Sequence, residues 1–249
     1  MYVLSLLCHK SKKQIEVYDR GSYDLQRCIT VPGLRNPSNI VICAHHHCGY
    51  ISDMSKSCVH RLALRSADVT QWPVSNSPVG LSVTDTHSLL VTCYLARSLE
   101  EFTTDGHLVR QVKLYYVTSP NHAIQLSSGE FIVCDGNPYN SIHRVCLVNS
   151  DGEVVRSYGS QQGSGSQRVN TPTHVAVDRD GFVYVADSDN RRVLLLSQSL
   201  SYLREVVSHD QLEYRPIGLC LDDDKGCLYV ACHERLAVVL LLLCCNTRR

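Results

Sequence analysis

A run of metal-ligating side chains lies in the first fifth of the chain, at Cys43-Ala-His45-His46-His47-Cys48. Thiolates and imidazoles are the ligands that zinc prefers in proteins. Zinc sites usually take their ligands from two separated pairs, and six adjacent residues in a hairpin cannot easily place four donors tetrahedrally. We therefore predict a polar turn here, with a zinc site as the alternative.

A second polar segment, Asp187-Ser-Asp-Asn-Arg-Arg192, has carboxylates that could serve calcium binding or acid–base chemistry. Asp and Asn side chains also bond to their own backbone in tight turns, and an arginine can pack over a hairpin. We interpret the segment as a structural turn. The sequence contains no GxSxG, HExxH or paired CxxC motif. We therefore assign no catalytic residue, and we predict a protein that is not an enzyme and that has no cofactor and no resident metal.

The elements around this second segment have the period of β-strands. In residues 171–196, Val175 and Val177 alternate with smaller or polar residues. An Asp-Arg-Asp-Gly turn at residues 178–181 precedes a second apolar stretch at 183–185. Residues 193–196 and 202–207 supply two more strands. Together they predict a four-stranded antiparallel meander.

The same unit recurs along the chain, and each copy begins at a proline followed by alternating apolar residues. The prolines are Pro37, Pro78, Pro120, Pro172 and Pro216, at spacings of 41, 42, 52 and 44 residues. One position at the end of the second strand recurs as Asp53, Cys93, Asp135, Asp187 and Cys232. Four strands per repeat of this length are typical of a β-propeller blade.

We therefore predict an all-β protein, a six-bladed propeller of four-stranded antiparallel blades, with five blades as the alternative. A single propeller domain would span residues 1–249. Its full repeats would be 37–77, 78–119, 120–171 and 172–215, with partial blades at 1–36 and 216–249.

The repeat resembles a known family. The pattern in residues 172–193 is proline, apolar alternation, D-x-D-G, V-Y-V-A-D and S-D-N-R-R-V. This pattern resembles the NHL-repeat β-propellers, and the resemblance covers nearly the whole chain. It implies a six-bladed propeller. Through the tripartite-motif NHL proteins, it also implies a role as the substrate-recruiting part of a ubiquitin-ligase-type protein. The fold alone does not fix a function.

The propeller prediction also places two histidines near the central channel. His122 and His174 each follow a repeat proline by two residues, at the start of a first strand. First strands line the central channel of a propeller, so both histidines are expected near its mouth. Peptide-amidating lyases are NHL-like propellers whose channel histidines hold zinc, which makes a zinc lyase the less favoured alternative. Catalytic zinc needs a third ligand, and the repeat supplies none at this position. We expect these histidines to bond to backbone or water.

Composition limits the partners and the compartment. The 249 residues carry 24 Lys+Arg and 24 Asp+Glu, so the net charge is zero and favours neither DNA nor another charged partner. The 13 cysteines are an odd number and occur within expected strands as often as in turns. We predict free thiols in a reducing compartment, the cytoplasm. The apolar run at residues 236–245 is too short to span a membrane, and no membrane partner is expected.

One loop face of the expected propeller is the candidate binding surface, because second-to-third-strand turns and inter-blade loops share a face. Eleven cations are assigned to it, Lys10, Lys12, Lys13, Arg35, Lys56, Arg97, Arg168, Arg191, Arg192, Arg215 and Arg235. Seven acids share it, Asp53, Asp135, Asp187, Asp189, Asp210, Glu213 and Glu234. Our candidate binding residues are Lys56, Arg97, His122, Tyr139, His174, Asn190, Arg191, Arg215 and Arg235.

We predict a protein partner on this face, with single-stranded RNA as the alternative because basic residues lie among tyrosines. A solvated rim of mixed charge without a partner is equally compatible with the count.

Overall fold

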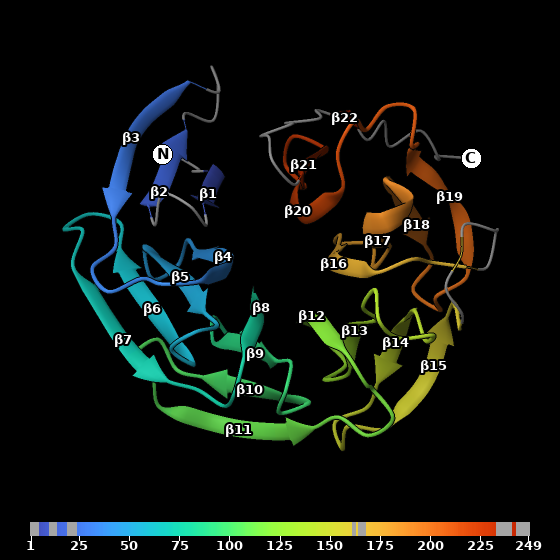
Figure 1. Ribbon diagram of the computed structural model, residues 1–249, viewed down its shortest axis with the longest axis horizontal. Coiled ribbons are helices and arrows are strands. Elements are labelled where there is room, and N and C mark those ends of the chain that lie inside the picture. Colours follow the sequence, from blue (N-terminus) through green and yellow to red (C-terminus); the bar gives the residue numbers. More distant parts are fainter. Residues whose placement is uncertain are drawn as a thin grey trace. The chain divides into compact units, whose positions relative to one another are not determined.

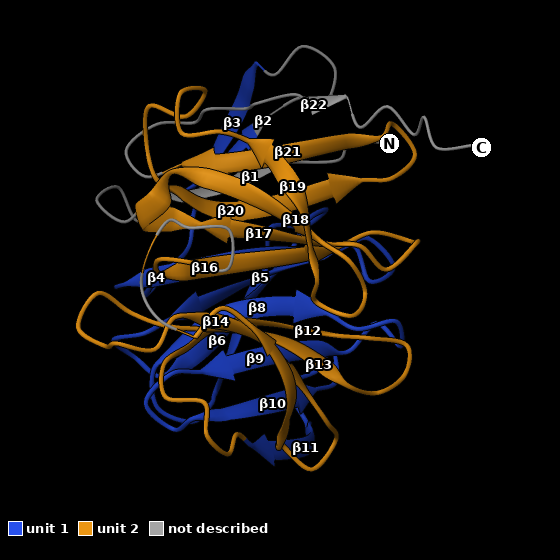
Figure 2. Ribbon diagram, turned by 90° about the vertical axis from the view of Figure 1, so that its right-hand side faces the viewer, with its two compact units in different colours: residues 1–113 blue, residues 114–249 orange. Residues whose placement is uncertain are grey.

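The computed structural model describes residues 5–9, 14–18, 24–160, 163, 168–232 and 241–242. The chain divides into two compact units, unit 1 at residues 1–113 and unit 2 at residues 114–249 (Figure 2). The described strands form six antiparallel sheets, three in each unit, and within each sheet the strands follow one another in chain order. No helix among these residues is long and apolar enough to cross a membrane.

Unit 1 contains one three-stranded sheet and two four-stranded sheets (Figure 1). The three-stranded sheet is β1 (Ser5–His9), β2 (Gln14–Tyr18) and β3 (Leu25–Thr30). The second sheet is β4 (Pro37–Cys43), β5 (Cys48–Asp53), β6 (Cys58–Ala63) and β7 (Val69–Pro73). The third is β8 (Pro78–Val83), β9 (Leu89–Cys93), β10 (Ser98–Phe102) and β11 (Leu108–Lys113).

Unit 2 contains two four-stranded sheets and one three-stranded sheet. The first is β12 (Pro120–Gln125), β13 (Phe131–Asp135), β14 (Arg144–Val148) and β15 (Val154–Tyr158). The second is β16 (Pro172–Val177), β17 (Val183–Asp187), β18 (Arg192–Leu196) and β19 (Tyr202–Val207), with the short 3₁₀ helix η1 (Ser188–Asn190) between β17 and β18. The third is β20 (Pro216–Asp222), β21 (Cys227–Cys232) and β22 (Leu241–Leu242).

The four-stranded meander predicted from the sequence is confirmed, and each complete sheet starts at the proline that set the repeat. The four repeats predicted as complete each form a four-stranded sheet. Four of the six sheets have four strands, whereas the first and last have three among the described residues. Within the part of the chain that the structure describes, each terminal segment, residues 1–36 and 216–249, contributes a three-stranded sheet.

Burial follows strand order within each sheet. Every residue of β5, β9, β13 and β17 is buried, although the sequence of a strand in a one-sided sheet would alternate. For β5 and β17, which belong to the middle sheet of each unit, the reason is that neighbouring sheets of the same unit pack against both faces. In unit 2, one apolar cluster joins Ile132 and Val145 to Val175 and Val185, and another joins Ala186 to Val230. The fourth strands, such as β15 and β19, are mostly exposed.

In three of the complete sheets, a buried carboxylate at the end of the second strand holds the segment that enters the sheet. Asp53, Asp135 and Asp187 are 0% exposed. Each accepts hydrogen bonds from backbone N–H groups just before the proline of its own repeat. The distances are 2.7 and 3.1 Å from Arg35 and Asn36, 3.0 and 2.8 Å from Thr118 and Ser119, and 2.6 Å from Asn170. The carboxylate therefore fixes the segment that enters the sheet, and we call this arrangement the aspartate clamp.

The sheet β8–β11 has Cys93 in place of the aspartate, and a different strand supplies the carboxylate. Glu100 on β10 is 3% exposed and accepts a 3.0 Å hydrogen bond from the Ser75 N–H. Gln111 Nε2 donates to the same carboxylate at 2.7 Å. Burial and the Glu100 charge raise the pKa of the Cys93 thiol, so it stays protonated. Glutamate from the third strand thus replaces the missing clamp.

Candidate functional site

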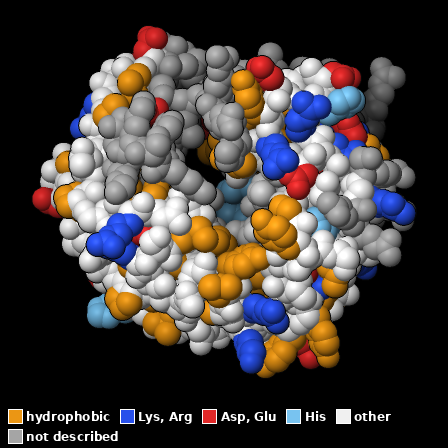
Figure 3. Space-filling model, in the orientation of Figure 1, with side chains coloured by type: hydrophobic (Ala, Val, Ile, Leu, Met, Phe, Trp, Pro, Cys, Tyr) orange, Lys and Arg blue, Asp and Glu red, His pale blue; other side chains and the backbone are white. Residues whose placement is uncertain are grey.

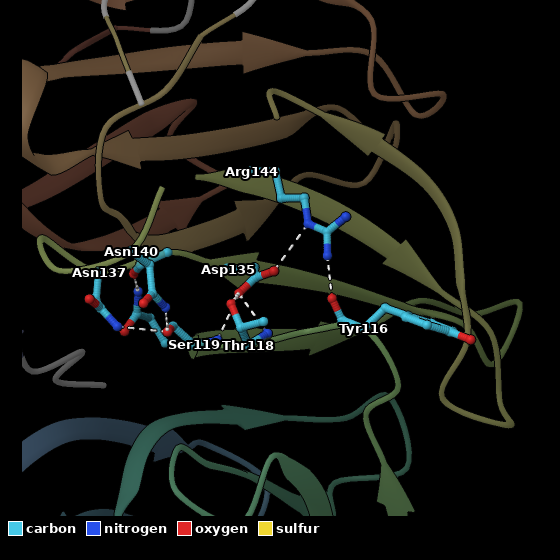
Figure 4. Close-up of polar contacts among 9 residues, drawn as sticks. Tyr116, Thr118, Ser119, Asp135, Asn137, Asn140 and Arg144 are labelled. Atoms are coloured by element: carbon cyan, nitrogen blue, oxygen red, sulfur yellow. Dashed lines mark hydrogen bonds and ion pairs between the residues drawn. The ribbon is translucent and has the colours of Figure 1, made fainter. Parts of the chain in front are cut away.

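The loop between β13 and β14, residues 136–143, is held by side-chain hydrogen bonds at its base (Figure 4). Asn137 Nδ2 and Asn140 Nδ2 both donate to Ser119 Oγ, at 2.7 and 2.5 Å. The Tyr139 N–H donates to Asn137 Oδ1 at 2.7 Å, and the Asn140 N–H donates to the Asn137 carbonyl at 3.0 Å. This Asn-Pro-Tyr-Asn segment is therefore a closed turn rather than a loose connection.

A buried histidine completes the support of this loop. His143 is 0% exposed, and its Nδ1 accepts a 2.7 Å hydrogen bond from the Thr171 N–H. Because Nδ1 accepts, the ring proton is on Nε2, which donates to the Asn140 carbonyl at 2.7 Å. The imidazole therefore links the loop to the segment that enters β16.

Tyr139 lies at the tip of this loop and is 96% exposed. The backbone on both sides of it is hydrogen-bonded, so the aromatic ring is presented from a fixed base. We call residues 136–143 the tyrosine loop.

The turn between β17 and β18 is also tied to its surroundings. Asn190 Nδ2 donates to the Gly163 carbonyl and to Asp187 Oδ2, both at 2.8 Å. Arg192 Nε contacts Asp187 Oδ2 at 2.6 Å, and Arg215 Nη1 lies 3.1 Å from Asp189 Oδ1. The predicted structural turn is thus observed, and the Asn190 side chain is already used within the unit. Arg191 is exposed.

The environment of Asp187 contains opposing effects on its pKa. Burial raises the pKa, while hydrogen bonds from Asn170, Asn190 and Arg192 lower it, and burial prevails. At Asp53 burial also raises the pKa, but hydrogen bonds from the backbone N–H groups of Arg35, Asn36 and Lys56 outweigh it and leave the pKa below its ordinary value. The same clamp position therefore has different acidity in the two units.

Several charges counted on the candidate face are not on the surface. Asp53, Asp135 and Asp187 are fully buried, and Arg192 is 8% exposed. In unit 2 the remaining described charges balance, three cations against three acids: Arg168, Arg191 and Arg215, and Asp189, Asp210 and Glu213. In unit 1 three cations remain, Arg35, Lys56 and Arg97. The only acid assigned to the face in this unit, Asp53, is buried. Figure 3 shows side chains of both signs scattered over the face it displays. The expected excess of positive charge is therefore absent from the described part of unit 2.

His122 and His174 come together, as their shared repeat position implies, but not on an open surface. Their rings stack with centroids 3.6 Å apart and an angle of 22° between planes. His122 is 1% exposed, and the Val175 N–H lies 3.5 Å from its Nδ1. Burial, followed by the nearby His122, lowers the pKa of His174 well below its ordinary value. His122 is therefore a packing residue here and not a surface contact.

This stack does not fit a shared zinc ion. An imidazole binds a metal in the plane of its ring, and two rings stacked 3.6 Å apart with 22° between their planes do not direct their nitrogens to one common point. Among the residues that the structure describes, no group of three ligand side chains is placed to hold a metal.

In unit 1, Lys56 lines a surface depression of about 600 Å³ together with the end of β3, the start of β7 and His60. His60 is 0% exposed and lies near Cys58 and Asp53, but one atom, Nε2, faces both partners, at 3.5 and 3.7 Å. A catalytic triad uses opposite ring nitrogens for its nucleophile and its acid. Burial raises the pKa of Cys58, so this cluster is not an activated nucleophile.

The other predicted residues are divided between the units. Arg97 is exposed in the β9–β10 turn beside Leu95, which is 63% exposed. Arg235, with Lys10, Lys12, Lys13 and Glu234, lies outside the described residues. Sequence reasoning included Tyr139 but not Asn137, Asn140 and His143, which hold it in place. The asparagines beside Pro138 were the available signal, because Asn and Pro are typical turn formers.

Comparison with solved structures shows which proteins share this fold. No family model matches the sequence, and no curated protein matches it. Virginiamycin B lyase from Staphylococcus aureus, a catalytically inactive variant with quinupristin, is similar in structure, with 11% sequence identity and a TM-score of 0.67. That match covers 91% of this chain and 73% of the lyase. Kuenenia stuttgartiensis hydrazine synthase has 12% identity and a TM-score of 0.68, over 95% and 91% of the two chains. Both neighbours are β-propeller proteins, and at this identity the likeness extends to the fold alone: an all-β, propeller-like arrangement of four-stranded antiparallel sheets.

Proposed function

We propose that this protein is a non-catalytic binding module that holds a protein partner on the tyrosine loop of unit 2. The observation that carries this proposal is Tyr139, 96% exposed on a loop fixed by Ser119, Asn137 and Asn140. Tyrosine is enriched among the residues that dominate binding energy in protein interfaces. A fixed loop loses little conformational freedom on binding, which favours affinity.

The charges near the loop favour protein over RNA. RNA binding depends on unpaired cations that follow the phosphate backbone. In unit 2 the described surface cations are matched by acids, and Arg215 is in an ion pair with Asp189. A polar rim of mixed charge around an exposed aromatic residue is typical of a protein interface.

We propose that the protein is not an enzyme because the geometry of two histidine clusters does not suit catalysis. The His122–His174 rings stack instead of converging. His60 offers the same nitrogen to Cys58 and Asp53. Neither arrangement supports the zinc lyase considered from the sequence.

We further propose that the chain is an NHL-like, six-bladed propeller in which the two three-stranded sheets count as partial blades. Support comes from the recurrence of the proline start and the aspartate clamp in matching positions. By this resemblance, the module would recruit substrates for a ubiquitin-ligase-type protein in the cytoplasm.

The test is a crosslinking pull-down from cell lysate, read for both protein and RNA, with wild type compared against Tyr139→Ala. We expect at least one protein to be recovered with wild type and lost with Tyr139→Ala. A matched control is Tyr116→Ala, since Tyr116 is 82% exposed in a different loop of the same unit. The control should recover the same partner as wild type.

The proposal is wrong if Tyr139→Ala recovers every wild-type partner. Loss of RNA instead of protein would replace the protein partner by single-stranded RNA. In that case, reversing Arg168 and Arg191 to glutamate should reduce the salt dependence of binding, by about one unit of log–log slope for each phosphate that is no longer neutralised.

A further inference from the structure

In two of the complete sheets, an arginine side chain joins the aspartate clamp to the segment that enters the sheet. In the sheet β12–β15, Arg144 Nε donates to Asp135 Oδ2 at 3.0 Å, and Arg144 Nη2 donates to the Tyr116 carbonyl (Figure 4). In the sheet β16–β19, Arg192 donates in the same way to Asp187 and to a backbone carbonyl, at 2.6 and 2.9 Å. In both sheets the accepting carbonyl belongs to the residue four positions before the repeat proline.

In the sheet β4–β7, a cysteine takes the place of this arginine. The strand register pairs Asp53 with Cys58, just as it pairs the other two clamp aspartates with their arginines. Gly33 is the residue four positions before the proline of this repeat. The short Cys58 side chain cannot reach across to it, and the depression of about 600 Å³ lies here, lined in part by Gly33, Lys56 and His60. The depression therefore follows from the loss of one large side chain.

His60 lies at the base of this depression, on the inner face of β6. Leu62, two residues further on, packs into the apolar cluster that includes residues of β2 and β3. Alternate residues of a strand share a face, so His60 also faces the sheet β1–β3. Gln71 lies opposite His60 in the β6–β7 register, and it lines the depression together with Thr30 at the end of β3 (Figure 1). Two sheets of unit 1 thus form its walls.

One ring nitrogen of His60 lacks a partner. Nε2 lies 3.7 Å from Asp53 Oδ2 and 3.5 Å from Cys58 Sγ, whereas Nδ1 is buried and has no hydrogen-bond partner among the described residues. Although burial raises it, the pKa of Asp53 stays below its ordinary value because backbone N–H groups bond to the carboxylate. An ionised carboxylate beside Nε2 favours the ring proton on that nitrogen. Burial lowers the pKa of His60, so the ring is neutral near pH 7 and Nδ1 is left as an acceptor.

The Lys56 ammonium is the charged group of the depression. A Cβ added at Gly33 would lie 2.9 Å from Lys56 Nζ, so the absence of a side chain there gives the ammonium its place. The Lys56 N–H is held by Asp53 Oδ1 at 3.3 Å, which fixes the start of the lysine side chain. Its charge acts on His60, whose pKa it lowers in addition to burial. No carboxylate among the described residues forms an ion pair with Lys56.

We propose that this depression binds a small carboxylate that carries an amide N–H or a hydroxyl next to the carboxylate. The carboxylate pairs with the Lys56 ammonium, and the N–H or O–H donates to His60 Nδ1, which removes the cost of a buried polar atom without a partner. Thr30 and Gln71 supply further hydrogen-bonding groups in the walls. A volume of about 600 Å³ suits a small ligand. An N-acyl amino acid and the carboxyl end of a peptide share this chemistry.

The experiment is NMR titration of the full chain with N-acetyl-L-alanine and with its methyl ester, which lacks the negative charge. We expect saturable binding of the acid at one site, with a change in the ¹⁵N signal of His60 Nδ1 as that nitrogen accepts a hydrogen bond. The ester should bind about tenfold more weakly or not at all, because it cannot pair with Lys56.

Three variants test the assigned groups. Lys56→Met keeps most of the side-chain length but removes the charge, and should weaken binding of the acid by about tenfold or more. Lys225→Met is the matched control, because Lys225 is an exposed lysine in the β20–β21 turn and is not part of the depression. It should bind as wild type does. Cys58→Arg restores the clamp arginine to this repeat and should abolish binding by filling the depression.

A tetra-alanine peptide with an acetylated N-terminus and a free carboxyl end distinguishes the two sources of the ligand. Tighter binding than N-acetyl-L-alanine assigns the site to a peptide carboxyl end, and weaker binding assigns it to a small molecule; both outcomes uphold the proposal. The proposal is overturned if neither probe binds saturably, or if the ester binds as tightly as the acid. Undiminished binding in Lys56→Met, or an equal loss in Lys225→Met, also overturns it.

Discussion

At the scale of single residues, each clamp carboxylate holds the segment that enters its sheet. Asp187 is fully buried and bonded to Arg192, itself 8% exposed. Arg192 Nη1 also pairs with the more exposed Glu205 at 2.6 Å, so removing the Asp187 charge takes away the buried partner of the guanidinium and leaves only the exposed one.

We predict that Asp187→Asn lowers the free energy of unfolding by about 2 kcal/mol or more. Urea denaturation followed by circular dichroism measures this difference. Asp210→Asn, at an exposed carboxylate, should change stability by less than about 0.5 kcal/mol. Equal effects of the two substitutions would show that the clamp is not a source of stability.

His174 makes stability depend on pH. Its pKa is depressed in the folded protein, first by burial and then by His122, whereas in the unfolded chain it is near 6.5. Below that value the unfolded chain binds the extra proton, so stability should fall as pH decreases from about 7 to 5, by up to about 1.4 kcal/mol per pH unit. His60, also depressed by burial, acts in the same direction.

Urea unfolding across this range in wild type and His174→Gln checks the effect. The amide can still stack on His122 but does not titrate, so the slope of stability against pH should become shallower. An unchanged slope would mean that His174 does not contribute.

At the scale of elements, the tyrosine loop packs against a glycine that follows β15, and a larger residue there would collide with the loop. Gly159 has a φ of +79°, and an added Cβ would lie 2.8 Å from the His143 carbonyl oxygen and 3.0 Å from Val169. Gly129 has a similar φ of +88°, but no atom lies within 4 Å of the same position. Both substitutions to alanine incur the strain of positive φ, and only one creates a collision.

We therefore predict that Gly159→Ala destabilises the protein by at least about 1 kcal/mol more than Gly129→Ala. Thermal or urea unfolding of the two variants measures the difference. Hydrogen exchange of residues 136–143 should also increase in Gly159→Ala alone. Equal stabilities would mean that the segment after β15 can shift without affecting the loop.

At the scale of the whole molecule, the cysteines test the packing. Eight of the ten cysteines with described side chains are buried, and only Cys28 and Cys220 are exposed. Burial also raises the pKa of Cys146, to about 12, and that of Cys232, to about 11. Thiols that are buried and protonated react slowly with alkylating reagents.

Brief alkylation of native protein, followed by mass spectrometry, should label Cys28 and Cys220 and leave these eight unlabelled. Denaturation should expose all of them. Rapid labelling of Cys134 or Cys146, which are 0% exposed, would contradict the packing of β13 and β14.

The repeat was predictable because proline and the clamp position recur in the sequence with strand-like alternation. The complete sheets therefore start where Pro37, Pro78, Pro120 and Pro172 indicated. The candidate site was less predictable. Charge counting treated Asp135 and Asp187 as surface acids, since sequence alone does not show that backbone amides bury them. The hydrogen bond from the Thr171 N–H to His143 depends on packing between sheets, which no local pattern encodes.

The aspartate clamp also bears on the order in which the chain folds. Each carboxylate and its backbone donors are separated by only 16 to 18 residues. Such a short loop closes with little entropy loss, so the contact can form as soon as the first hairpin of a repeat does. The charge then has its hydrogen-bond donors before the neighbouring sheet stacks over it and removes water. In β8–β11 the Ser75–Glu100 contact spans 25 residues and must wait for the third strand. The carboxylate contact of that repeat therefore forms only once three strands are in place, one more than in the neighbouring repeats.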